Sequence, residues 1–127
     1  MTTNLKRILY VEDDEDIAEV AVMALEALGN FEVTHCLSGK SAIESYLSVA
    51  PQLVLIDVMM PEMDGLETIT ELTKEYGPSL APFIFMTARA QLHEQAVYRE
   101  MGALEVIIKP FDPLTLCGDI EKVWSQN

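Results

Sequence analysis

Short apolar runs recur along the chain at fairly even spacing. Three of them are apolar throughout, whereas the second and the fifth also carry polar positions. The runs cover residues 8–11, 31–36, 53–56, 83–86 and 104–108. Continuous apolar runs of this length are typical of parallel strands covered on both faces. The pattern therefore predicts five strands, with the second and the fifth at the edges of the sheet.

Amphipathic segments alternate with these runs and predict five helices. The first has its apolar stripe at Ile17, Ala21, Ala24, Leu25 and Leu28 and stops at Gly29-Asn30. The next three cover 41–49, a segment around 66–72 closed by Gly77-Pro78, and 91–101. The last is predicted to begin at Asp112-Pro113, a cap residue followed by a first-turn proline. Such alternation predicts a doubly wound α/β fold with a parallel sheet and helices on both faces.

Length and charge narrow the possible functions. The 127 residues suffice for one domain, 1–127, with nothing left for an output domain. With 8 Lys+Arg against 21 Asp+Glu, the net charge is 8 − 21 = −13. That charge repels nucleic acid phosphates and anionic lipids, so we expect no direct DNA binding and no binding to a membrane surface.

The chain carries no recognisable targeting or membrane-spanning segment, because its first apolar run has only four residues. Two cysteines, Cys36 and Cys117, are too few for a disulfide framework. A cytoplasmic protein with reduced thiols is predicted.

Charged and polar residues follow the predicted strands. Glu12 and Asp13 come after the first run, Asp57 after the third, Thr87 after the fourth and Lys109 after the fifth. In a doubly wound sheet the carboxyl ends of the strands form the site. Three carboxylates, a hydroxyl and an ammonium are therefore expected to meet at one edge.

Clustered carboxylates repel one another unless a cation neutralises them. Mg²⁺ prefers oxygen ligands and usually takes one or two carboxylates together with water and phosphate oxygens. A carboxylate at Asp57, beside such a metal, can act as a nucleophile toward a phosphoryl group. Lys109 would supply further positive charge, and the Thr87 hydroxyl could bond a phosphate oxygen.

The order and spacing of these residues resemble the receiver domain of two-component response regulators, in its stand-alone, chemotaxis-regulator-like form. The matching segments are 8–14, 57–65, Met86-Thr87-Ala88 and Lys109-Pro110-Phe111. The resemblance extends over about residues 6–123. It implies a flavodoxin-like (βα)5 fold with strand order 2-1-3-4-5.

By this resemblance, Asp57 is the aspartate that a histidine kinase or phosphotransfer protein phosphorylates. Asp13 and Asp57 bind Mg²⁺, or Mn²⁺, directly; the backbone carbonyl of Met59 is a further ligand, and Glu12 acts through water.

Thr87 and Lys109 are implied to contact the phosphoryl group. The resemblance also implies a cis peptide between Lys109 and Pro110.

Three positions bear on how the signal is read out. Val106 stands where the family usually has an aromatic residue in the fifth strand, so we expect backbone shifts around the fourth helix to carry the signal. By the resemblance, Met59 and Arg89 would flank the path of the attacking water and tune the phosphoryl lifetime. The resemblance places the output surface on the fourth helix, fifth strand and fifth helix, about 91–123. The chain would be either a stand-alone receiver that signals through another protein, as a monomer or a phosphorylation-dependent dimer, or a fragment of a longer regulator.

Three alternatives lead to different expectations. An aspartate-nucleophile phosphohydrolase would need a second acid two residues after the nucleophile, where this chain has Met59. A phosphorylation-independent interaction module would be signalled by loss of a site residue, and none is lost. A flavodoxin-like cofactor binder would need a phosphate-binding loop after the first strand, where this chain has Glu12, Asp13 and Asp14.

Overall fold

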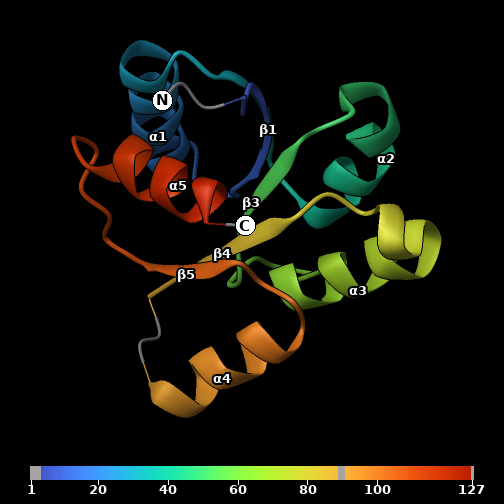
Figure 1. Cartoon of the computed structure of the whole chain (residues 1–127). Helices are drawn as coiled ribbons and strands as arrows, with labels where there is room; N and C mark the ends of the chain where they lie inside the picture. The colour runs from blue at the N-terminus through green and yellow to red at the C-terminus, as the bar shows by residue number, and fades with distance from the viewer. Residues whose placement is uncertain (1–3, 89–90, 127) are drawn as a thin grey trace.

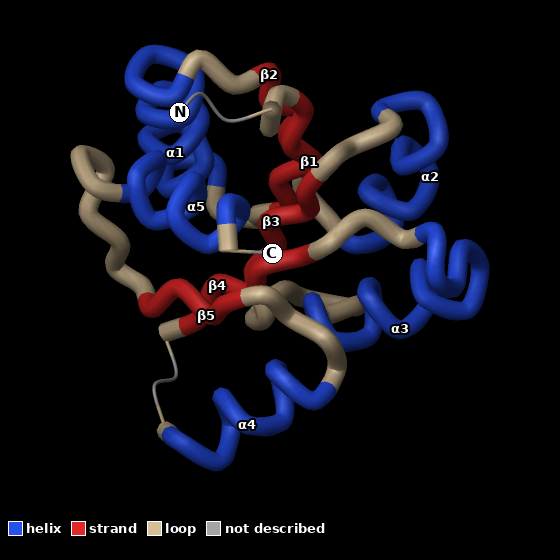
Figure 2. The backbone as a smooth tube through the Cα atoms, in the orientation of Figure 1, coloured by secondary structure: helices blue, strands red, loops and turns tan. Residues whose placement is uncertain are grey.

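A parallel β-sheet occupies the centre of the molecule (Figure 2). The computed structural model describes residues 4–88 and 91–126, and within them five strands pair in the order β2-β1-β3-β4-β5. The strands are β1 (Arg7–Val11), β2 (Glu32–Cys36), β3 (Leu53–Asp57), β4 (Phe83–Thr87) and β5 (Glu105–Ile108). Both the predicted strand order and the two predicted edge strands are confirmed.

Helices cover both faces of the sheet (Figure 1). On one face lie α1 (Glu15–Gly29) and α5 (Leu116–Ser125); on the other lie α2 (Gly39–Val49), α3 (Gly65–Tyr76) and α4 (Leu92–Glu100). A short 3-10 turn, Gly77–Ser79, follows α3. None of the helices within the described residues is long and apolar enough to span a membrane.

Alternate residues of the strands build two separate cores. Ile8 and Tyr10 of β1 pack toward α1 and α5, whereas Leu9 and Val11 pack toward α2 and α3. All five residues of β3 and all five of β4 are buried. The continuous apolar runs are explained by this two-sided burial, since neither face of the central strands meets water.

Local signals for the ends of α1 and α3 agree with the structure. The Asp14 side chain accepts hydrogen bonds from the first turn of α1, and Asn30 ends that helix in the left-handed conformation with φ 57°. Asp64 caps α3 and forms a capping box with Glu67. Both caps follow directly on segments that carry site residues, so they fix where those segments leave the sheet.

Three predictions at the helices were wrong. Helix α5 begins at Leu116 rather than at Asp112-Pro113, because Asp112 instead closes a turn whose side chain accepts from the Leu114 N–H. The Asp112 carbonyl accepts from the N–H of residues 115 and 116. Helix α2 begins at Gly39, two residues before the predicted start. Leu28 is 57% exposed rather than packed on the α1 stripe.

Candidate functional site

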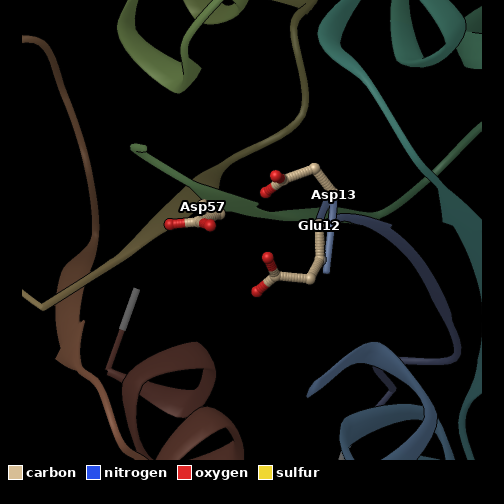
Figure 3. Close-up of side chains that lie close together, drawn as sticks. All are labelled: Glu12, Asp13 and Asp57. Carbon is tan, nitrogen blue, oxygen red and sulfur yellow. The ribbon is translucent and has the colours of Figure 1, made fainter. Parts of the chain in front are cut away.

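Three carboxylates converge at the carboxyl end of the sheet (Figure 3). Glu12 and Asp13 directly follow β1, and Asp57 is the last residue of β3, the strand that pairs with β1. One oxygen atom from each carboxylate lies within 4.8 Å of the other two. The predicted cluster of acids is therefore formed.

The three carboxylates differ in their access to water. Glu12 is fully buried and Asp57 is 3% exposed, whereas Asp13 lies open to solvent at the mouth of the site. Burying a carboxylate is costly unless a positive charge or hydrogen bonds compensate it. The two buried acids therefore require a partner.

Lys109 supplies that partner from the segment after β5. Its Nζ lies 2.7 Å from Glu12 Oε1 and 3.2 Å from Asp57 Oδ2, so one ammonium bridges both buried acids. The Lys109 backbone N–H donates to the Thr87 carbonyl at 2.8 Å, which fixes the lysine beside the end of β4. With three carboxylates and one ammonium, the cluster retains negative charge.

Electrostatics at the site favour protonation of Glu12 and Asp13. Burial raises the pKa of Glu12, and the nearby Asp57 adds to this, although the hydrogen bond from Lys109 opposes it. Partial burial and the neighbouring Glu12 also raise the pKa of Asp13. Burial would lower the pKa of Lys109, but its hydrogen bond to Glu12 and the charge of Asp57 produce a net increase. The Lys109 ammonium is therefore held in its charged form, and it compensates the negative charge of the three carboxylates only in part.

Backbone contacts hold Asp57 in place. Its Oδ1 accepts a hydrogen bond from the Met59 N–H at 3.2 Å. Gly65, at the start of α3, packs directly against the strand end: a Cβ at that position would lie 2.3 Å from the Asp57 carbonyl oxygen. The Gly65 N–H also donates to the Val58 carbonyl. These contacts tie α3 to the backbone of the acceptor segment.

The other predicted site residues are placed as follows. Thr87 is buried and ends β4, one residue past Met86, which pairs with Asp57. Val106 is buried in the core against α4, and Arg89 lies outside the described residues. The Lys109–Pro110 peptide is cis, which confirms that prediction.

The cluster opens into a cleft of about 690 Å³. One wall is charged and includes Asp16 beside the acids and the lysine already described. The other is largely apolar and includes Ile17, Val20, Met59, Phe111 and Pro113. The sequence interpretation assigned Ile17 to the core, and it did not single out Val20. Asp16 and Val20 are four residues apart on α1, and this spacing would have indicated that the first two turns of the helix border the site.

The donor set suits a hard divalent cation. Its side-chain donors are carboxylate oxygens, two of them partly neutralised and the third open to solvent. Mg²⁺ and Mn²⁺ prefer such oxygen ligands, and a cation here would offset the charge that Lys109 leaves uncompensated. The residues present therefore fit the predicted metal.

Comparison with known proteins agrees with this geometry. Residues 8–121 match the model of the response regulator receiver domain. The chain is 36% identical over 111 residues to the regulatory protein AtoC of Escherichia coli, and 37% identical over 116 residues to the transcriptional regulatory protein CseB of Streptomyces coelicolor. These matches cover 87% and 91% of this chain but 23% and 48% of the two relatives, so the chain spans about half their length or less.

The fold is also similar to that of solved receiver structures. A CheY-like response regulator receiver domain protein from Methanospirillum hungatei has a TM-score of 0.83 at 28% identity, over 97% of this chain and 96% of that one. Sequence match, strand order and acidic cluster all agree. The chain therefore belongs to the response regulator receiver domain family.

Proposed function

We propose that the chain is a phosphorylation switch in which Asp57 accepts a phosphoryl group from a histidine kinase or a phosphotransfer protein. The observation that carries this proposal is the Lys109 bridge between the buried Glu12 and Asp57, with Asp13 beside them at the open side. Such a cluster places a nucleophilic carboxylate among groups that can neutralise an incoming phosphoryl group.

Mg²⁺ or Mn²⁺ would be held by Asp13, Asp57 and the carbonyl of Met59, with Glu12 acting through water. The cation supplies charge neutralisation for the phosphoryl oxygens when it is bound. Because Asp13 is open to solvent while Glu12 and Asp57 are buried, the cleft is the side from which these residues would bind a cation.

Transfer would proceed by attack of an Asp57 carboxylate oxygen on the phosphorus of a phosphohistidine. A phosphorus–oxygen bond forms while the phosphorus–nitrogen bond breaks, and the imidazole of the donor leaves with the electron pair. Lys109, already 3.2 Å from Asp57, is placed to bind a phosphoryl oxygen, with Thr87 as a second donor.

The signal would then pass to another protein through the surface of α4, β5 and α5. With Val106 in place of an aromatic residue, the readout would rely on shifts of the segments that flank α4. Such a switch needs two states of similar energy, between which the added negative charge selects. A cytoplasmic location and a monomer or phosphorylation-dependent dimer complete this proposal.

The test is phosphorylation by a small phosphodonor. Wild type incubated with Mg²⁺ and acetyl phosphate should gain one acid-stable, base-labile phosphoryl group in its intact mass, and excess chelator should prevent the gain. Asp57→Asn should gain none. Asp64→Asn is the matched control, because it removes a nearby acid while asparagine still caps α3. Equal labelling of wild type and Asp57→Asn would refute the proposal.

A further inference from the structure

The Tyr10 hydroxyl is a buried polar group without a partner. The side chain is fully buried in β1, and among the described residues no group meets its oxygen at hydrogen-bonding geometry, although the Glu12 carboxylate lies near enough to interact with it. A buried hydroxyl that makes no hydrogen bond destabilises a protein, whereas phenylalanine has a similar shape without that cost. The presence of tyrosine rather than phenylalanine at this position therefore needs an explanation.

The position of Tyr10 suggests that reason. It precedes Glu12 by two residues on the same strand, so both side chains point to the same face of the sheet. The Tyr10 ring packs against the ring of His35, which itself contacts the Glu12 carbonyl at 2.8 Å. A phenol is an O–H donor at neutral pH, so Tyr10 can donate to a carboxylate on this face of the sheet.

Glu12 is the acid whose bonds would change during phosphorylation. Its Oε1 accepts from Lys109 at 2.7 Å, and its Oε2 accepts from the Asp14 N–H at 3.2 Å. Lys109 is shared with Asp57, so a phosphoryl group on Asp57 would draw the ammonium toward its own oxygens. Glu12 would then lose its strongest donor while remaining buried.

We propose that Tyr10 is a positioning residue whose hydroxyl donates to the Glu12 carboxylate once Lys109 turns to a phosphoryl group on Asp57. The new hydrogen bond keeps the buried carboxylate compensated and oriented toward the water shell of the metal. This inference rests on the proposed function. It assigns Tyr10 a role in one of the two states only: its hydroxyl is unsatisfied in the unmodified protein and bonded in the phosphorylated one.

Replacement of the hydroxyl tests this assignment. Tyr10→Phe should leave the metal-free protein at least as stable to urea as wild type, because it removes an unpartnered polar atom. In the presence of beryllofluoride, which imitates a phosphoryl group on a carboxylate, the same variant should bind Mg²⁺ about tenfold more weakly by calorimetry, the effect of one hydrogen bond to a charged group.

Tyr46→Phe is the matched control. Tyr46 is also a buried tyrosine, but its hydroxyl accepts a hydrogen bond from the Ala81 N–H at 2.8 Å, away from the acids. This variant should lower the stability of the metal-free protein and leave Mg²⁺ affinity unchanged. The two substitutions should therefore show opposite patterns.

A double-mutant cycle separates positioning from packing. If Tyr10 acts through Glu12, Tyr10→Phe should have no further effect on Mg²⁺ affinity once Glu12→Ala has removed the acceptor. Wild-type affinity in Tyr10→Phe, or the same loss with and without Glu12, would overturn the inference. Failure of wild type itself to bind Mg²⁺ and beryllofluoride would instead refute the proposed function.

A second measurement needs no variant. In wild type labelled with ¹³C at tyrosine Cζ, the Tyr10 resonance should shift when Mg²⁺ and beryllofluoride are added together and stay in place with Mg²⁺ alone. A Tyr10 resonance that does not respond to the mimic would overturn the inference even if Tyr10→Phe fails to fold.

Discussion

Glu12, Asp13, Asp57 and Lys109 form a site whose charges do not balance. The single ammonium is shared by the two buried acids, and the third acid faces solvent. The alternation of predicted strands and helices along the chain was sufficient to predict that these residues meet, because the carboxyl ends of parallel strands share one edge of the sheet. Their pairing was not predictable, since only the folded chain determines which acid the lysine reaches.

Mg²⁺ binding should weaken as the pH falls, starting above the usual carboxyl range. The pKa values of Glu12 and Asp13 are raised, so protons compete with the cation earlier than at ordinary carboxylates, whose pKa is about 4. An acid whose pKa is raised on folding stabilises the metal-free protein at low pH, and that stabilisation is lost as the pH rises. Calorimetric titrations between pH 8 and pH 5 measure the effect. A Mg²⁺ affinity that did not change over that range would contradict it.

Asp13→Asn should abolish measurable Mg²⁺ binding while the protein stays folded, because Asp13 is the solvent-facing carboxylate of the cluster. Glu26→Gln is the control, since it removes one negative charge from the exposed side of α1. Calorimetry should give wild-type affinity for the control. Equal losses in both variants would mean that net charge, rather than the cluster, binds the cation.

At the scale of the elements, the helices differ in how clearly the sequence marks their ends. The cap of α1 was readable because Asp14 directly precedes an apolar stripe, whereas Asp64, which caps α3, was interpreted only as a turn residue. The start of α5 was not, because Asp112-Pro113 carries the same signal and yet forms a turn. The site wall was also missed: α1 borders the cleft only because the chain turns there immediately after β1.

Gly65→Ala should destabilise the protein by about 1–3 kcal/mol, because a Cβ there would overlap the Asp57 carbonyl oxygen. It should also slow phosphorylation, since the acceptor backbone must move. Gly118→Ala in α5 is the matched control: its Cβ has open space, and helix propensity should add up to about 1 kcal/mol. Urea unfolding distinguishes them, and equal stability of the two variants would contradict this packing.

At the scale of the whole molecule, the 21 acidic residues behind the net charge of −13 fall into two groups. A few of them form the site, and the others cover the surface. As a member of the receiver domain family, the chain is a phosphoacceptor signalling module rather than a true enzyme. The fold was predictable from the alternation of strands and helices, whereas the partners are not encoded in any pattern found in one chain.

Mg²⁺ should stabilise the folded protein more than a potassium salt at the same ionic strength. Any salt screens the repulsion among surface acids, but only specific binding adds the linkage term, about 2.7 kcal/mol at one hundred times the dissociation constant. Thermal unfolding in the two salts measures the difference. Identical midpoints would show that screening alone accounts for the effect.

The most direct test of the central claim is to locate the phosphoryl group. Wild type labelled with acetyl phosphate and Mg²⁺ is digested at acid pH, and the peptides are sequenced by tandem mass spectrometry. The proposed switch predicts one phosphoryl group, on Asp57 at the end of β3. A phosphoryl group on another carboxylate, such as Asp13 or Asp64, or none at all, would contradict it.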